Sequence, residues 1–167
     1  MTSRILPLEA APLTAEAFAP FGRLPVDEGP GDETDLEFLW QDPHLNYIGH
    51  AASELRHGRR GPLCDLLNRH DTHTQVLMPV DAEAVLVVAP AALDFTRPEH
   101  LAAVRAFRVR RYECFALHRG SWHWGPYPPG RSGSVRLLNV QGRRYREDNG
   151  VARLEHDRGV LFEVIAS

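Results

Sequence analysis

Residues 75–89, with the sequence QVLMPVDAEAVLVVA, carry the strongest fold signal in this chain of 167 residues. Two apolar runs, residues 75–80 and 84–89, are rich in valine and leucine, and the polar residues 81–83 join them. Short apolar runs with many β-branched side chains favour strands in a packed sheet. The stretch therefore predicts either a buried hairpin or two consecutive strands.

Other short strand candidates surround this stretch, with turn signals between them. The run at residues 5–8 contains a proline, which predicts an edge strand. Many short strands separated by turns indicate a mainly β protein, a barrel or sandwich, rather than an alternating α/β fold. The further strand candidates are residues 36–40, 46–50, 105–110, 113–118, 135–140 and 159–165.

Helical signals are few. Residues 13–22 predict one short N-terminal helix of two turns, with Thr14 as its N-cap and Gly22 at its end. Residues 98–104 allow a single helical turn. The acidic, glycine-containing residues 26–35 predict a loop at the surface or over a site.

Composition bounds the function. The length favours a single domain over residues 1–167, and the net charge of −3 provides no basic field for nucleic acid. All 19 cationic side chains are arginine, so a Schiff-base lysine is excluded. Cys64 and Cys114 are isolated and suggest no disulfide framework or zinc knuckle. No signal-peptide or membrane-spanning pattern is present, and we expect a cytoplasmic protein without membrane partners.

Two segments concentrate titratable side chains. Residues 117–129 (LHRGSWHWGPYPP) follow a strand candidate and place histidine, arginine and tryptophan around a glycine, which predicts a site lining a cavity. The second segment contains His70, His73 and Gln75. On a regular strand His73 and Gln75 face one side and His70 the other, so a three-histidine site needs His70 in a loop or bulge. The residues leave open a transition-metal site or a metal-free site with histidines as acids and bases.

The order of these segments resembles that of metal-binding cupin barrels. The run from His118 to His123 is similar to their second motif, P-x-G-x-x-H, with histidine in place of proline. The segment from His70 to Gln75 occupies the place of their first motif, H-x-H-x(3,4)-E, with an incomplete set of ligands.

Four segments together resemble the ureidoglycolate lyase family. Residues 12–22 are similar to its P-L-(S/T)-x-E-A-F-x-x-(Y/F)-G, and residues 67–79 to its L-E-R-H-x-x-x-T-Q-x-x-x-P. Residues 105–107 match its R-A-F, and residues 119–123 resemble the segment that ends in W-H-H-P. The chain departs from the family pattern at Asn68, Asp71, Glu113, Ala116 and Trp124.

The resemblance implies a cupin-like β-barrel and a carbon–nitrogen lyase that eliminates urea from ureidoglycolate to leave glyoxylate. It implies a small carboxylate and ureido substrate and, together with the edge-strand argument, a homodimer. The cofactor stays open, with a divalent transition metal as the candidate. Two alternatives remain: another cupin enzyme acting on a small acid, such as a metal-dependent isomerase or dioxygenase, and a catalytically silent ligand-binding cupin.

These implied roles fall on a small set of residues. The proposed base is His123 or His70, and Glu113 is a proton donor or relay. Gln75 would hydrogen-bond the ureido oxygen. Each residue also has a structural alternative: a strand-end histidine, a surface arginine, a core tryptophan or an exposed ion pair. The remaining candidates are Arg69 or Arg119 for the substrate carboxylate, Trp122 for substrate binding, and His70, His73 and His123 for a metal.

Overall fold

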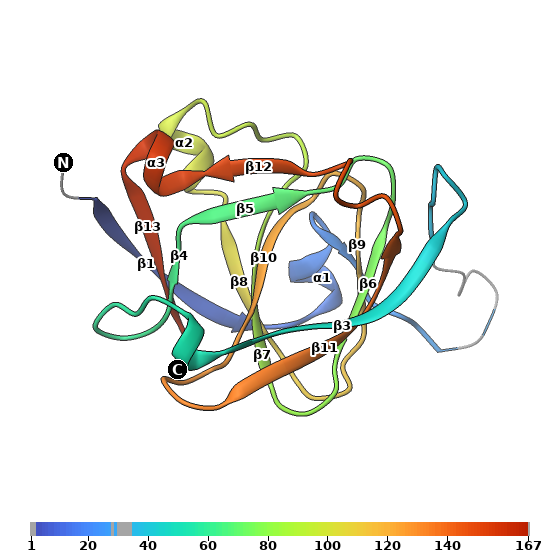
Figure 1. Cartoon of the computed structure of the whole chain (residues 1–167), viewed down its shortest axis with the longest axis horizontal. Coiled ribbons are helices and arrows are strands. Elements are labelled where there is room, and N and C mark those ends of the chain that lie inside the picture. Colours follow the sequence, from blue (N-terminus) through green and yellow to red (C-terminus); the bar gives the residue numbers. More distant parts are fainter. Residues whose placement is uncertain (1–2, 28, 30–34, 167) are drawn as a thin grey trace.

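The computed structural model of the chain describes residues 3–27, 29 and 35–166. Strands account for 47% of the structure and helices for 10%, which confirms the mainly β prediction. The strands form two sheets that curl as a half-barrel (Figure 1). The eight-stranded sheet has the order β12 (Gly150–Arg153), β5 (Leu66–Arg69), β10 (Trp122–Tyr127), β7 (Ala84–Ala89), β8 (Arg105–Val109), β1 (Arg4–Pro12), β13 (Val160–Ile165) and β4 (Leu63–Cys64).

The five-stranded sheet has the order β2 (Gly22–Arg23), β9 (Phe115–Leu117), β6 (Gln75–Pro79), β11 (Ser134–Gly142) and β3 (Pro43–Ala51). Short helices connect the strands: α1 (Ala15–Phe18), the 3-10 helix η1 (Ala52–Glu54), α2 (Pro98–Leu101) and α3 (Leu154–Arg158). None of the helices in the described part of the chain is long and apolar enough to cross a bilayer.

An apolar core fills one end of the space between the two sheets. Phe18 of α1 lies edge-on to Phe107 of β8 and to Phe115 of β9, with ring centroids 5.5 and 5.4 Å apart. All three side chains are almost fully buried. Because Phe107 belongs to the larger sheet and Phe115 to the smaller one, α1 joins the two sheets through aromatic contacts. Leu77 of β6 and Leu137 of β11 belong to the same core.

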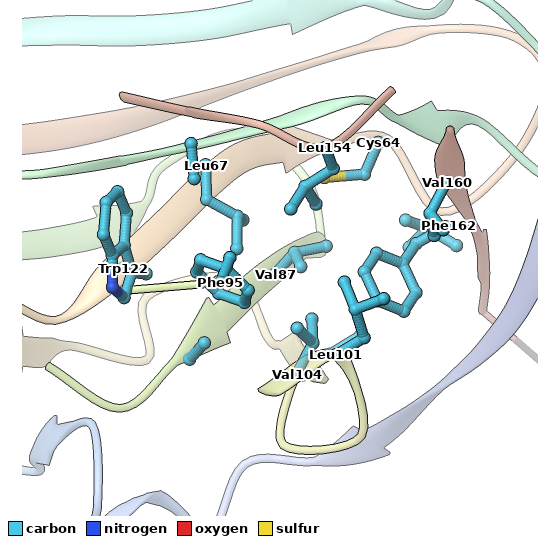
Figure 2. Close-up of a cluster of buried hydrophobic side chains, with 14 of the residues drawn as sticks. Cys64, Leu67, Val87, Phe95, Leu101, Val104, Trp122, Leu154, Val160 and Phe162 are labelled. Carbon is cyan, nitrogen blue, oxygen red and sulfur yellow. The ribbon is translucent and has the colours of Figure 1, made fainter. Parts of the chain in front are cut away.

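A second core covers the other face of the larger sheet. It packs Val87 of β7 and Trp122 of β10 against Phe95, Leu101 of α2 and Phe162 of β13 (Figure 2). Apolar clusters therefore lie on both faces of β7, and all six of its residues are buried. This explains the continuous apolar run in the sequence, where a half-exposed strand would alternate.

The two strands predicted over residues 75–89 are consecutive strands and not a hairpin. β6 lies in the five-stranded sheet and β7 in the eight-stranded sheet, so the chain crosses from one sheet to the other between them. The strands expected at residues 46–50, 105–110, 113–118, 135–140 and 159–165 are also present, as parts of β3, β8, β9, β11 and β13.

The N-terminal helix begins as predicted and ends early. Thr14 is its N-cap and accepts a hydrogen bond from the backbone N–H of Ala17 at 3.2 Å. The helix stops at Phe18, and Gly22 already belongs to β2, opposite Leu117 of β9. A Cβ on Gly22 would come within 2.0 Å of the Ala116 carbonyl oxygen. The glycine therefore allows two strands to approach and does not cap the helix.

Two further expectations are wrong. The run at residues 5–8 is no edge strand, because β1 lies between β13 and β8 and pairs in parallel with both. Residues 36–40 form a single bridge, from Phe38 to His73, followed by a turn. The single turn predicted near residue 98 is α2, whereas α3 was not expected from the sequence. The loop predicted at residues 26–35 lies mostly outside the described residues.

Candidate active site

The space between the sheets changes from apolar to polar along its length. On β11, Val135 and Leu137 face the apolar core, and the next two residues of the same parity are Asn139 and Gln141, both buried. On β6, Leu77 is followed toward the same end by Gln75, which is 5% exposed. We call the region around Phe18 and Leu137 the apolar end, and the region around Gln75 and Asn139 the polar end.

A cavity of about 340 Å³ opens at the polar end, a size that suits a small ligand. It lies between strands of both sheets, with side chains contributed by β3, β5, β6, β10 and β11 and by the segment that follows β11. The polar and aromatic residues that line it are His50, Asn68, His70, Gln75, His123, Trp124, Gln141, Tyr145, Arg146 and Asn149.

Three of the histidines in this lining share one hydrogen-bonding arrangement. The Nδ1 atoms of His50, His70 and His123 lie 2.9, 2.6 and 3.1 Å from the backbone carbonyl oxygens of Pro126, Asp148 and Ser121. A carbonyl oxygen only accepts hydrogen bonds, so each Nδ1 carries the proton and donates it. In the neutral form of each ring the Nε2 atom therefore has its lone pair available for a ligand.

Burial keeps the central histidines neutral. It lowers the pKa of His123 to about 3, and the neighbouring His70 ring, 5.4 Å away between centroids, acts in the same direction. Burial also lowers the pKa of His70, but the hydrogen bond to the Asp148 carbonyl and the charges of Asp148 and Asp71 oppose it. Of the two rings, His70 is therefore the one beside which negative charges stabilise an imidazolium ion.

His73 lies behind His70 and outside the cavity lining. Its ring stacks on His70 with centroids 4.9 Å apart, and its Nε2 atom is buried without a hydrogen-bond partner. Burial and the charge of a protonated His70 lower the pKa of His73 to about 4. A Cβ on Gly142 would lie 2.8 Å from its Nδ1 atom, so the glycine makes room for this ring. His73 supports the position of His70 from behind.

The Asp148 side chain holds the turn that carries the histidines. Its carboxylate accepts hydrogen bonds from the backbone N–H groups of Asp71 and Thr72 at 3.0 and 2.8 Å, and from the Thr72 hydroxyl. These bonds lower the pKa of Asp148, against the effect of its own partial burial. Asp148 thus ties the segment after β11 to the loop between β5 and β6, which places His70 beside His123.

A row of amides forms the floor of the polar end. The Gln75 Nε2 atom donates to Asn139 Oδ1 at 2.8 Å, and Asn139 Nδ2 donates to Asn46 Oδ1 at 2.7 Å. The Gln75 Oε1 atom is buried without a partner. The sequence predicted that Gln75 hydrogen-bonds a ureido oxygen, and one of the two N–H donors of its amide is already engaged by Asn139. The unpartnered atom of Gln75 is Oε1, an acceptor that suits a ligand N–H group.

A cation and a phenol lie in the segment that follows β11. Arg146 is exposed, and its Nε–H group donates to the Tyr145 hydroxyl at 3.0 Å. The Tyr145 ring lies against His44 and His70, with centroids 5.4 and 6.3 Å away. Arg146 is the one arginine among the described residues that line the cavity. An anionic group of a ligand would bind there.

The structure brings only some of the predicted site residues together: His70, His123 and Gln75 meet in the cavity, whereas Arg69, Trp122, Glu113 and Arg119 lie elsewhere. Arg69 alternates with Asn68 on β5, so its side chain leaves the opposite face of the sheet. There Arg69 lies 5.0 Å over the Trp122 ring and binds Asp71. The Trp122 indole donates to the Leu93 carbonyl and packs against Phe95 in the second core (Figure 2).

Glu113 and Arg119 lie outside the cavity lining, on other elements. Glu113 lies in the turn before β9, where it pairs with Arg110 at 3.1 Å. Arg119 pairs with Glu37 at 2.6 Å, in a separate hollow beside β2 and β9. None of Arg69, Arg119, Trp122 and Glu113 therefore lines the cavity in which His70, His123 and Gln75 meet.

Several residues that line the cavity were missed in the sequence. Tyr145 and Arg146 line the cavity but were not among the predicted site residues. A polar residue at an inward position of an otherwise apolar strand, as at Gln141, is the signal that would have found part of this group. For Arg146 and His50 the sequence offers no such signal, because their place depends on how distant segments pack.

A metal centre finds no support in the arrangement of these side chains. The cupin resemblance implies one at His70, His73 and His123, whose rings do lie together. Yet among the described residues no group of three or more His, Cys, Asp or Glu side chains is placed to hold a metal ion. His73 also lies outside the cavity lining. The residues do not fit a metal centre, and we derive no step through one.

The fold and the cavity define a class, a cupin-like β-barrel with a cavity at the polar end of the space between its sheets. A family model described as ureidoglycolate lyase matches residues 41–149. This is more than half of the chain, and the chain belongs to the ureidoglycolate lyase family. A search of curated proteins finds no match.

The family match encloses all the residues that line the cavity, from Ile48 to Asn149. Of the positions at which the chain departs from the family pattern, Asn68 and Trp124 line the cavity, whereas Asp71, Glu113 and Ala116 do not. Three of the five departures therefore lie outside the cavity lining. Membership in this family supports an enzyme of the lyase or hydrolase kind as the general function.

Proposed function

We propose that this protein eliminates urea from ureidoglycolate and releases glyoxylate. The observation that carries the proposal is the pairing of His70 and His123 at the cavity, each with its Nδ1 proton donated to a backbone carbonyl. Family membership supports the reaction class. The substrate has a carboxylate, a hydroxyl and a ureido nitrogen on one carbon, and the cavity offers a cation, bases and an amide acceptor.

The reaction requires one proton to move from oxygen to nitrogen. The hydroxyl loses its proton to a base, its oxygen forms the carbonyl of glyoxylate, and the carbon–nitrogen bond breaks. The leaving ureido nitrogen takes up a proton and departs as urea. The atoms balance without a co-reactant, so a single imidazole can accept the proton and then deliver it.

His70 fits the role of the base better than His123. The charges of Asp148 and Asp71 stabilise a proton on His70, whereas the pKa of His123 is lowered to about 3. In this proposal His70 Nε2 removes the hydroxyl proton and returns it to the ureido nitrogen. His123 stays neutral, and its Nε2 atom accepts a hydrogen bond that orients the substrate.

The remaining groups bind the ends of the substrate. Arg146, at the cavity lining and free of any carboxylate partner among the described residues, binds the substrate carboxylate. This role replaces the one predicted for Arg69 or Arg119. Gln75 Oε1 accepts a hydrogen bond from the ureido group.

The test is release of urea and glyoxylate from racemic ureidoglycolate by wild type and by His70→Asn. The asparagine amide can still donate to the Asp148 carbonyl but lacks the Nε2 base. We expect turnover to fall by about a hundredfold or more, and by at least about tenfold for His123→Asn. His156→Asn is the matched control, because His156 lies exposed on α3 beside Asp157 and outside the cavity.

Three outcomes would contradict the proposal. If turnover falls by less than tenfold in folded His70→Asn, His70 is not the base of the reaction. Ligand-induced thermal stabilisation by glyoxylate or urea without turnover would identify a silent binding protein instead. We expect activity to survive a chelator, whereas activity that needs added divalent ions would favour a metal-dependent cupin reaction.

A further inference from the structure

The strongest unexplained feature of the cavity is the unpartnered oxygen of Gln75. The side chain is 5% exposed, and a buried carbonyl oxygen without a hydrogen bond is costly. Gln75 lies in the cavity lining, so a bound ligand is the natural source of the missing donor. Such a ligand must present an N–H or O–H group at the floor of the cavity.

The orientation of that oxygen depends on residues behind it. Asn139 is fully buried, and its Oδ1 atom holds the Gln75 N–H group at 2.8 Å. The orientation of Asn139 is set in turn by Asn46, whose Oδ1 atom accepts from Asn139 Nδ2 at 2.7 Å. The three strands β6, β11 and β3 are neighbours, and Asn139 is opposite Asn46 in the register. The amides thus form a row that runs from the sheet edge to the cavity.

We infer that Asn46 and Asn139 are positioning residues that fix Gln75 as a hydrogen-bond acceptor, and that this acceptor selects ligands with a terminal urea –NH2 group over isosteric ligands without it. The inference rests on the proposed function for the nature of the ligand. It adds a basis for specificity. Gln75 Oε1 accepts a hydrogen bond from the terminal –NH2 group of the ligand, whereas a ligand with a methyl group in that position leaves Gln75 Oε1 unpaired.

The experiment uses two stable analogues that lack the hydroxyl and therefore cannot react. N-carbamoylglycine carries the terminal –NH2 group, and N-acetylglycine has a methyl group in its place. Binding to the full chain is measured by calorimetry. We expect wild type to bind N-carbamoylglycine about tenfold more tightly, the value of one hydrogen bond to a buried acceptor.

The variants separate positioning from simple support. Asn139→Leu should bring the affinity ratio of the two analogues close to one, because nothing then holds the Gln75 amide. Asn139→Asp keeps an acceptor for Gln75 N–H and should keep most of the preference. A residue that only supports the fold would lower both affinities equally and leave the ratio unchanged.

Asn46→Ala provides a second variant if Asn139→Leu does not fold. Asn46 lies on the edge strand β3 and is only partly buried, so its loss disturbs the core less. We expect it to lose part of the preference, because Asn139 then lacks the acceptor that orients it. Circular dichroism melts establish that each variant is folded.

Several results would overturn the inference. These are equal affinity of wild type for the two analogues, a preference for N-acetylglycine, no binding of either one, or an unchanged ratio in folded Asn139→Leu and Asn46→Ala. The readout needs no turnover. A protein that discriminates between the analogues but releases no urea would support this inference and contradict the proposed reaction. A protein that turns over ureidoglycolate but binds the two analogues equally would support the proposed reaction and contradict this inference.

Discussion

At one end of the space between the sheets, β11 turns Val135 and Leu137 inward, and at the other end the same strand turns Asn139 and Gln141 inward. The strands and the alternation are the same, and only the residue type changes. The apolar end packs Phe18 of α1 against the rings of Phe107 and Phe115. The polar end carries unpaired lone pairs on Gln75 and the histidines. The comparison indicates that the apolar end stabilises the fold, whereas the polar end leaves hydrogen-bonding atoms available to a ligand at a cost in stability.

The largest effect is expected from a substitution at the apolar end, and it concerns the stability of the fold. Phe18→Ala removes the ring that contacts both sheets and leaves a cavity, so we expect the free energy of unfolding to fall by about 4 kcal/mol. Guanidinium-induced unfolding measures it. Leu45→Ala, on the exposed side of β3, is the control and should change stability by less than about 0.5 kcal/mol. A loss below about 1 kcal/mol for Phe18→Ala would mean that α1 does not join the sheets.

The second prediction concerns the cost of the polar end at low pH. The pKa values of His123 and His73 are about 3 and about 4 in the folded state and near 6.5 in the unfolded chain. Between pH 6.5 and 4 the unfolded chain therefore binds more protons than the folded protein. The free energy of unfolding should stay level above pH 6.5 and fall as the pH decreases to 4.

Below pH 6.5, each of these two histidines lowers the free energy of unfolding by about 1.4 kcal/mol for each pH unit, until the pH reaches its pKa in the folded state. Asp148 acts in the same direction but only below its ordinary pKa, because its own pKa is lowered. His73→Gln should reduce the slope between pH 6.5 and 4, and exposed His156→Gln should not. Stability that is unchanged between pH 7 and 4.5 in wild type would contradict the burial of neutral histidines.

The smallest effect leaves the fold intact and changes ligand binding. Arg146→Gln removes the cation at the cavity, and we expect KM for ureidoglycolate to rise by about 10- to 100-fold with little change in thermal stability. Arg143→Gln is the matched control from the same segment, because Arg143 is exposed and outside the cavity lining. Equal KM values for the two variants would mean that another residue, and not Arg146, binds the substrate carboxylate.

The local expectations that held are those set by neighbours in sequence. Thr14 caps α1 because an N-cap needs only the next turn of the helix. The valine-rich residues 84–89 form a strand buried on both faces. The edge position expected for residues 5–8 failed, because β1 pairs with β13 and β8, which are distant in sequence.

The residues predicted for the site also fall into two groups, those that line the cavity and those that do not. His70, Gln75 and His123 were predicted from motifs and do meet, but Arg69 and Trp122 leave the opposite face of the sheet because strand neighbours alternate. Glu113 and Arg119 lie in other parts of the surface with their own ion-pair partners.

By itself the sequence determined the mainly β class, the capped helix and the two histidine segments, since alternation and capping are local properties of a chain. Only the tertiary structure decided which faces of those segments meet. It brought Arg146 and Tyr145 to the cavity, bonded Asn139 to Gln75, and surrounded the histidines with protein that holds them neutral. Those relations join residues from different strands and sheets, and their physical cause is packing between distant segments.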